Sequence, residues 1–333
     1  MNWFGADERD APPLPANDST PASAPGRRRR FIWARIALSV LVLGVCGWAF
    51  TRLDLRATWQ TLLASNWWLL ALAALANLVV HLGLKATRWY VMLRPHGHVS
   101  FRHAYLYTLA ANAASSALPA RAGEVLRATL VRPHGVSLPT SAGIQIMEAA
   151  TETTSLVLVA LPLPWLLELP LGVRRAFGWL AVAAGIATLL AVLVTVHGHR
   201  LQSFAAWLGR GASALRSWRA AVVVGLVTLA ARYADAGILI LAAHAVGVHV
   251  NLWVAFLVIL AIDVALLVPT TPGGLGAFEA AVVGGLALLG QPPEHALAFA
   301  LAYHALQVIP GMVTGSLALW FIRARAAPFS PRP

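Results

Sequence analysis

Long apolar stretches alternate with short polar or basic ones along most of the chain. Six of the apolar stretches are close to the length of about 20 residues that a helix needs to cross a bilayer. They lie at residues 31–50, 67–93, 140–167, 176–197, 220–245 and 295–322. A β-barrel would instead show short segments of alternating polarity. The pattern therefore predicts an all-α polytopic membrane protein with about six full transmembrane helices.

Two further apolar stretches are interrupted near their middle. Residues 102–131 break at Pro119 and Gly123, and residues 252–290 break at a proline and a glycine with the same spacing. Irregular backbone at membrane depth must be buried in protein or line a water-filled cavity. Two re-entrant helical hairpins satisfy this, although full crossings in place of either hairpin leave every loop on the same side. Paired interruptions also indicate an inverted repeat with a transport site.

Charged residues at the ends of the stretches predict the topology. We interpret residues 1–30 as a disordered basic tail, residues 31–325 as one transmembrane domain and residues 326–333 as a short C-terminal tail. The loop at 198–219 holds arginines and no acidic residue. Cytoplasmic loops carry an excess of Lys and Arg. We therefore expect a multi-pass protein of the cell inner membrane with both termini in the cytoplasm.

The composition fits this class and excludes others. The chain of 333 residues is 59% hydrophobic and 11% charged, whereas soluble domains carry about 25% charged residues. The formal net charge is +12, but the arginines lie at the ends of apolar stretches, which fits membrane topology better than nucleic-acid binding. The single cysteine, Cys46, excludes an intramolecular disulfide and a cysteine-based metal site. We expect no metal and no cofactor.

Several acidic residues fall inside the apolar or interrupted stretches. They are six of the 13 acidic residues of the chain: Glu124, Glu148, Glu152, Asp235, Asp263 and Glu279. Each costs about 2.5–3.5 kcal/mol at the centre of a membrane helix, so each needs a cationic partner or water. The candidate partners are Lys85, Arg88, Arg121, Arg127 and Arg232. The set either clamps helices together or lines a polar cavity, and its size favours the cavity.

Helical periodicity places some of these side chains on shared faces. Gln145, Glu148 and Glu152 fall on one face of their predicted helix. A second polar stripe follows the helix predicted at 67–93 and consists of Asn77, His81, Lys85 and Arg88. Arg232 and Asp235 lie one turn apart and are the best candidates for a purely structural pair.

The chemistry of these groups indicates a lipid headgroup as the ligand. Arginines bind phosphate, while carboxylates suit a cationic or hydroxyl-bearing group, or carry protons as coupling ions. Together they fit a zwitterionic or anionic headgroup. Motifs of zinc proteases, of serine nucleophile elbows and of phosphate loops are absent from the sequence, so we expect no enzymatic activity.

Three motifs carry a resemblance to a known family. They are Pro119-Ala-Arg-Ala-Gly-Glu-Val-Leu-Arg127, the carboxylate pair Glu148 and Glu152, and Pro272-Gly-Gly-Leu-Gly-Ala-Phe-Glu279, and Arg88-Trp89 also fits. In this order, over residues 31–325, the sequence resembles the transmembrane region of lysylphosphatidylglycerol synthases, also called the flippase-like domain family. The resemblance implies movement of a charged or glycosylated lipid between leaflets. It implies a translocation path that includes Arg88, Arg121, Glu124, Arg127, Glu148, Glu152, Pro272, Gly273, Gly274, Gly276, Glu279 and His304.

The chain departs from the family pattern at two positions. Glu152 stands where an Asp is common, and His304 stands where the last span often carries an Arg. A histidine here would alter the preferred headgroup or introduce pH sensitivity. Because the sequence ends just after the last span, we expect no soluble aminoacyl-transferase domain.

The leading hypothesis is an inner-membrane lipid transporter of the flippase type, passive or ion-driven. Arg121, Arg127 and Arg88 would bind the phosphate, and Glu279, at the tip of the second hairpin, would turn into a cavity shared with Glu124. The alternatives are an integral membrane transferase acting on lipid-linked sugars and a non-catalytic partner subunit whose charges are structural. The expected partner is a membrane phospholipid or lipid-linked substrate and not nucleic acid, and a homodimer is a candidate assembly.

Overall fold

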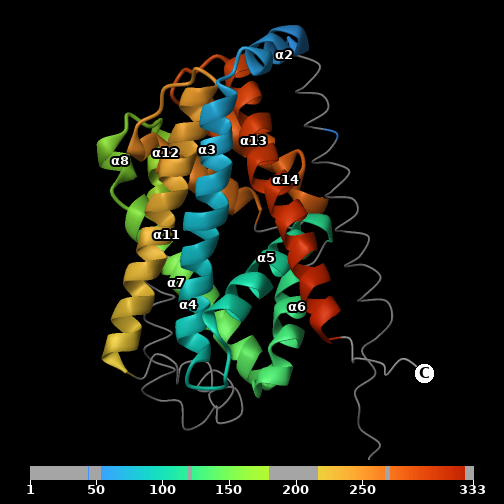
Figure 1. Cartoon of the computed structure of the whole chain (residues 1–333). Helices are drawn as coiled ribbons and strands as arrows, with labels where there is room; N and C mark the ends of the chain where they lie inside the picture. The colour runs from blue at the N-terminus through green and yellow to red at the C-terminus, as the bar shows by residue number, and fades with distance from the viewer. Residues whose placement is uncertain (1–43, 45–53, 119–121, 180–216, 267–270, 327–333) are drawn as a thin grey trace, which may run out of the picture.

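The fold is seen in a computed structural model of the chain, which describes residues 44, 54–118, 122–179, 217–266 and 271–326. Every regular element within these ranges is a helix, which confirms the all-α prediction (Figure 1). Several predicted features lie outside the described residues. These are the first span except for residue 44, most of the span at 176–197 and of the loop at 198–219, the tails at 1–30 and 327–333, and Arg121.

Four helices in the described ranges are long and apolar enough to cross a bilayer. They cover Trp67–Leu93, Leu138–Leu166, Trp218–Ala245 and Pro293–Ala324. The shortest has 27 residues, so it extends over about 40 Å, against about 30 Å for the hydrocarbon core of a membrane. Four of the six predicted spans are thus confirmed as helices of membrane-crossing length, and the chain is a multi-pass membrane protein.

The long helices are assembled from shorter elements. The first joins α3 (Trp67–Ala76), a π-helical turn η1 (Asn77–His81) and α4 (Leu82–Leu93). The others are α7 (Leu138–Ala160) with the short α8 (Leu163–Leu166), then α11 (Trp218–Ala245) and α14 (Pro293–Ala326). Polar residues cap the starts of two of them: the side chain of Asn66 accepts from the first N–H groups of α3, and the side chain of Ser137 accepts from the N–H of Thr140 in α7. Asp54 likewise caps the short helix α2 (Leu55–Leu63), which packs against α14.

Two pairs of shorter helices occupy opposite halves of the molecule. In the lower half of Figure 1, α5 (Phe101–Ala117) packs against α6 (Ala122–Leu130). In the upper half, α12 (Leu252–Ala265) packs against α13 (Ala277–Ala287). Helices α5, α6, α12 and α13 have 17, 9, 14 and 11 residues, respectively. Each is therefore shorter than a full transmembrane span, which needs about 20 residues. We call the two pairs the first and the second hairpin.

The tip of the second hairpin reaches the first. Gly273, Gly274 and Gly276 adopt φ values of 65°, 77° and 83°, a region that residues with a Cβ rarely adopt. The first two of these glycines lie in the short turn η5 (Pro272–Gly274), where Gly273 has non-helical dihedral angles, and η5 contacts α5. A Cβ on Gly273 would lie 3.2 Å from the backbone oxygen of Ser116, near the end of α5. The two interruptions predicted from the sequence therefore meet in the folded chain.

Three glycines let the neighbouring helices approach α5 closely. A Cβ on Gly315 of α14 would lie 2.3 Å from the backbone oxygen of Leu109. A Cβ on Gly123 of α6 would lie 2.0 Å from the backbone oxygen of Ala111. A Cβ on Gly311, one turn before Gly315, would lie 2.5 Å from the side-chain nitrogen of Asn112, on α5. Because a larger residue at Gly315 or Gly123 would push the backbones apart, these two positions allow the close packing of α5 against α14 and α6.

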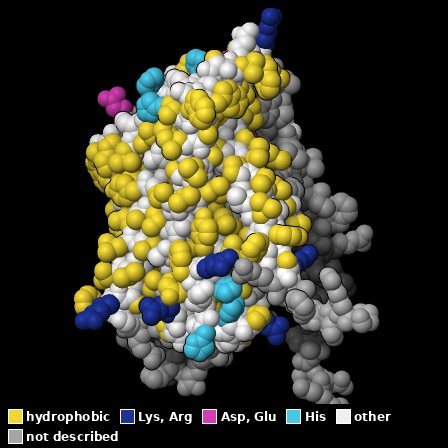
Figure 2. All heavy atoms as spheres, in the orientation of Figure 1, with side chains coloured by type: hydrophobic (Ala, Val, Ile, Leu, Met, Phe, Trp, Pro, Cys, Tyr) yellow, Lys and Arg dark blue, Asp and Glu magenta, His cyan; other side chains and the backbone are white. Residues whose placement is uncertain are grey.

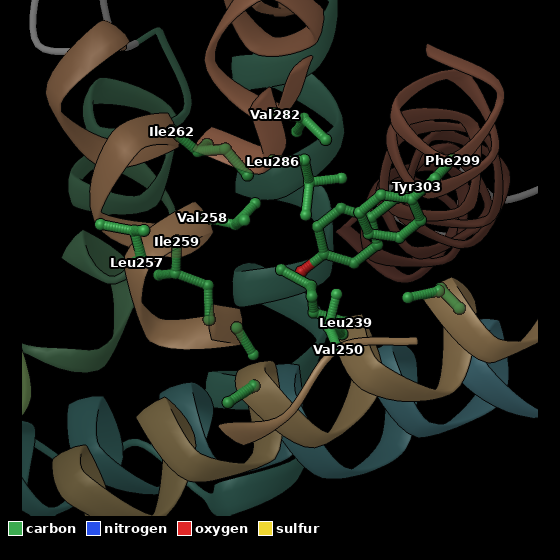
Figure 3. Close-up of a cluster of buried hydrophobic side chains, with 14 of the residues drawn as sticks. Leu239, Val250, Leu257, Val258, Ile259, Ile262, Val282, Leu286, Phe299 and Tyr303 are labelled. Atoms are coloured by element: carbon green, nitrogen blue, oxygen red, sulfur yellow. The ribbon is translucent and has the colours of Figure 1, made fainter. Parts of the chain in front are cut away.

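The largest apolar cluster in the described residues surrounds the second hairpin. Val258 from α12, Leu286 from α13, and Phe299 and Tyr303 from α14 converge there with Leu239 from α11 (Figure 3). This packing holds α12 and α13 among the long helices, so the second hairpin is an integral part of the bundle.

The two ends of the molecule differ in charge. Apolar side chains cover the middle of the face shown in Figure 2, and basic side chains gather mainly at its lower end. Helix ends at that end of the molecule carry Arg94, Arg102, Arg132, Arg219 and Arg323 and, among the described residues, no acidic residue. The opposite end mixes signs, with Asp54 and Arg56 beside α2 and Glu294 at the start of α14. Such asymmetry is typical of a membrane protein with a fixed orientation.

Candidate functional site

A polar cavity of about 620 Å³ lies where the two hairpins and the long helices converge. Its wall includes residues from α4, α5, α6, α7, α11, α12 and α14. The charged and histidine side chains on it are His81, Lys85, Arg88, Glu124, Arg127, Glu148, Glu152, Arg232, Asp235 and Asp263. Five of the six acidic residues that sequence reasoning placed in the membrane therefore share one cavity.

The inner part of the wall is a network of buried ion pairs. Nη2 of Arg88, on α4, lies 2.8 Å from Oε1 of Glu148 and 2.6 Å from Oε1 of Glu152, both on α7. Arg127, on α6, contacts the other oxygen of Glu148, and its guanidinium lies 4.5 Å from the ring centroid of Trp89. The amide of Gln145 donates to the backbone oxygen of Glu124 over 2.8 Å. The predicted polar face of α7 thus meets cations from two other helices.

Burial separates the members of this network into two groups. Arg88 is 1% exposed, and Glu148 and Arg127 are also buried. At the edge of the network, Lys85 and Glu152 face each other over 3.4 Å, and their side chains are 34% and 37% exposed. In this arrangement Lys85 and Glu152 are open to a ligand, whereas Arg88 is enclosed by its glutamates. The phosphate-binding role expected of Arg88 therefore requires the network to open.

The predicted pairing of Arg232 with Asp235 is wrong. Nη1 of Arg232 lies 2.9 Å from Oδ2 of Asp263, across on α12, and the side chain of Asp263 is 39% exposed. Asp235 instead accepts a hydrogen bond of 3.0 Å from the hydroxyl of Tyr303, on α14. The long arginine side chain reaches the neighbouring helix, while Tyr303 supplies Asp235 with a donor. The two aspartates therefore connect α11 to two other helices.

Glu279 and His304 do not open into the cavity, contrary to the prediction. One oxygen of Glu279 accepts from the N–H of Gly276 over 2.7 Å, and the other lies 2.6 Å from Nδ1 of His304. Nε2 of His304 lies 2.9 Å from the backbone oxygen of Gly273. Both side chains are buried. The first N–H groups of a helix have no partner within it, and the Glu279 carboxylate stabilises the start of α13 by accepting from the N–H of Gly276.

His304, which stands where the family often has an Arg, makes a polar contact with each of its two ring nitrogens. Because a carbonyl oxygen only accepts, Nε2 of His304 must donate to Gly273. The short Nδ1–Oε1 contact also needs a proton, which lies on His304 or on Glu279. His304 thereby joins the glycine-rich tip to α14, and Phe278 stacks on its ring with centroids 4.3 Å apart.

The remaining residues predicted for the site either shape the backbone of the hairpin tip or line the cavity. Gly273, Gly274 and Gly276 shape the tip of the second hairpin, and the side chain of Pro272 is outside the described set. Glu124 lines the cavity beside the first interruption. Within the described ranges, no group of three or more His, Cys, Asp or Glu residues could hold a metal ion.

The matched family agrees with the motifs. The family model described as the lysylphosphatidylglycerol synthase TM region matches residues 32–315. The chain belongs to this family. A search of curated proteins found no match. The residues matched to the lysylphosphatidylglycerol synthase TM region include both hairpins and the whole cavity wall, so the chain is an integral membrane protein related to lipid handling.

Sequence reasoning missed several cavity residues within this lysylphosphatidylglycerol synthase TM region. Lys85, Arg232, Asp235 and Asp263 had been noted as charges in apolar helices but were not assigned to the site. Tyr303 had no such signal, because a tyrosine in an apolar helix is ordinarily a packing residue. Its hydrogen bond to Asp235 depends on how α14 faces α11, which no local pattern encodes.

Proposed function

We propose that this chain is a lipid transporter of the flippase type, which moves a charged or glycosylated headgroup between the leaflets of the cell inner membrane. The observation that carries the proposal is the cavity of about 620 Å³ with charges of both signs, placed between long apolar helices. Charges inside a membrane domain are costly, and they commonly mark substrate and ion pathways. The lipid-related family supports the same function.

The size and chemistry of the cavity suit a headgroup. Ligand sites typically measure about 300–1,000 Å³, and the acyl chains of a lipid need no place in the cavity because they can remain in the bilayer. Lys85 is the open cation for a phosphate oxygen, while Glu152 and Asp263 are open carboxylates for an ammonium or hydroxyl group. A headgroup that carries both kinds of group would use both sides of the site.

We further propose that both hairpins are re-entrant, the first from the cytoplasmic side and the second from the opposite side. Support comes from their helix lengths, which are too short for full spans, and from their meeting at the interruptions. The arginine-rich end of the bundle, which includes the C-terminal end of α14, would then face the cytoplasm.

An enzymatic role is less well supported by the geometry. A general acid must hold a proton that it can donate, but Glu148 contacts two guanidinium groups and Glu152 contacts Arg88 and Lys85. These cations favour the ionised forms. We therefore propose that the carboxylates bind and guide a substrate and do not transform it.

Translocation by the purified chain tests the proposed function. Proteoliposomes with fluorescent lipids in one leaflet, over a panel of anionic, zwitterionic and glycosylated headgroups, are expected to lose the leaflet asymmetry of at least one lipid. Empty vesicles and vesicles with heat-denatured protein provide the controls. Rates equal to those of empty vesicles for the whole panel would contradict the transporter function, and a chemically altered lipid product would favour the transferase.

A further inference from the structure

His81 lines the cavity from a helical turn that two other helices hold in place. It is the last residue of the π-helical turn η1, and such turns often occur at functional sites. Nδ1 of its ring lies 3.2 Å from the backbone oxygen of Ala231, on α11. The hydroxyl of Tyr105, on α5, donates to the backbone oxygen of Leu78 in the same turn over 2.8 Å. The turn that carries His81 is therefore fixed against both α11 and the first hairpin.

The contact with Ala231 determines where the proton of the His81 ring lies. Because a carbonyl oxygen only accepts, Nδ1 carries the proton. In a neutral imidazole the other nitrogen, Nε2, is then a hydrogen-bond acceptor. We expect the neutral ring at this position, because a charge inside a membrane helix is costly and the cation Lys85 follows one turn later.

Nε2 of His81 is available as an acceptor on the cavity wall. The acidic residues whose charges act on the ring, Asp235 and Glu152, already accept hydrogen bonds, from Tyr303 and Arg88 respectively. In the part of the chain that the structure describes, Nε2 makes no hydrogen bond. It is also not completely enclosed, in contrast to the unpaired Nε of Arg88. A donor that enters the cavity can therefore reach Nε2.

We propose that His81 determines which headgroups the cavity accepts, by taking a hydrogen bond at Nε2 from a hydroxyl or N–H group of the lipid. Lys85 lies four residues further along, so the two side chains are neighbours on the helix surface. With Lys85 on a phosphate oxygen, Nε2 meets a donor that a short carbon link joins to that phosphate. The ligand class is a phospholipid with such a donor in its headgroup. The inference rests on the proposed lipid transport and specifies its substrate.

Two lipids that differ in one hydrogen-bond donor test the proposal. A dimethylethanolamine headgroup keeps one N–H, whereas a choline headgroup has a third methyl group in its place. In proteoliposomes the wild-type chain is expected to move the dimethylethanolamine lipid about tenfold faster than the choline lipid, the size of one hydrogen bond to a charged donor. Equal rates for the two lipids would overturn the proposal and leave the transporter function intact.

Two variants separate the roles of the two ring nitrogens. In His81→Asn the amide nitrogen takes the place of Nδ1 and keeps the link to Ala231, but the Nε2 acceptor is lost. In His81→Gln the amide oxygen takes the place of Nε2. His81→Asn is expected to lose the preference for the donor-bearing lipid, and His81→Gln is expected to keep it. His295→Asn, which changes an exposed histidine outside the cavity, should behave like the wild type. A preference that survives in His81→Asn would overturn the proposal.

Nitrogen NMR of the reconstituted chain tests the role of His81 without transport. The signals that disappear in His81→Asn belong to this ring and are expected to show a proton on Nδ1 only. Starting from choline-lipid bilayers, added lipids with dimethylethanolamine, glycerol or sugar headgroups are expected to shift the Nε2 signal. A proton on Nε2, or a signal that none of these lipids shifts, would overturn the proposal. If no lipid is translocated but the Nε2 signal shifts, the transport function fails and the headgroup contact stands.

Discussion

At the scale of single residues, the cavity depends on charges that compensate one another across helices. Glu148 lies between two guanidinium groups, Arg88 from α4 and Arg127 from α6. Removing one partner of a buried ion pair leaves the other charged without compensation, which costs more than the pair itself contributes. Glu148 therefore holds three helices in register, and its role differs from that of the half-exposed Glu152.

Replacing Glu148 by glutamine is expected to destabilise the fold. The change leaves two buried guanidinium groups facing a neutral amide, at a cost of about 3–5 kcal/mol. The measurement is thermal unfolding of the purified variant in detergent, followed by circular dichroism. Glu168→Gln is the control and is expected to unfold like the wild type, because its side chain is exposed. Equal unfolding temperatures for all three proteins would show that Glu148 is not a structural member of the network.

The sequence allowed only part of this ion-pair network to be predicted. Helical spacing correctly placed Gln145, Glu148 and Glu152 toward one cavity. It could not choose their partners, because Arg88 and Arg127 come from other helices. Glu279 was placed in the cavity because a carboxylate in an apolar stretch suggests a polar site. Its actual partners are the N–H of Gly276, within the glycine-rich tip, and His304, which lies 25 residues further along the chain.

At the scale of elements, glycines decide how closely the helices pack. Gly315 and Gly311 of α14 face α5, and Gly123 of α6 approaches α5 from its own hairpin. The predicted breaks in the two interrupted stretches are present, and their proline and glycine pattern was sufficient to find them. The two tips were expected to face each other, but the pattern alone could not show which residues meet there, since those contacts depend on the packing of α14 against both hairpins.

Gly315→Ala is expected to weaken the contact between α14 and α5. The new methyl group would lie 2.3 Å from the backbone oxygen of Leu109, so the backbones must separate, at a cost of about 1–3 kcal/mol. Thermal unfolding in detergent measures the loss. Gly225→Ala is the matched control, because nothing lies within 4 Å of its added Cβ. If the two variants are equally stable, the close packing of α5 on α14 is not a stabilising contact.

At the scale of the whole molecule, two hairpins face each other around a charged cavity within a bundle of long apolar helices. The apolar pattern predicted the membrane class and the four long helices found in the described ranges. The cavity itself follows from long-range packing, because its wall combines residues from His81 to Gln307. Its two layers, enclosed Arg88 and Glu148 and open Lys85 and Glu152, suggest that the open layer meets the headgroup while the enclosed layer holds the helices.

The central claim is that this cavity is the path of the headgroup, and lipid translocation by Glu152→Gln tests it most directly. In proteoliposomes containing a lipid that the wild type moves, Glu152→Gln is expected to slow translocation about tenfold or more, equivalent to about 1.4 kcal/mol of lost interaction. Because Arg88 keeps its pair with Glu148, Glu152→Gln should unfold nearer the wild-type temperature than Glu148→Gln does. Glu168→Gln should keep the wild-type rate. Translocation by Glu152→Gln at the wild-type rate would contradict the account.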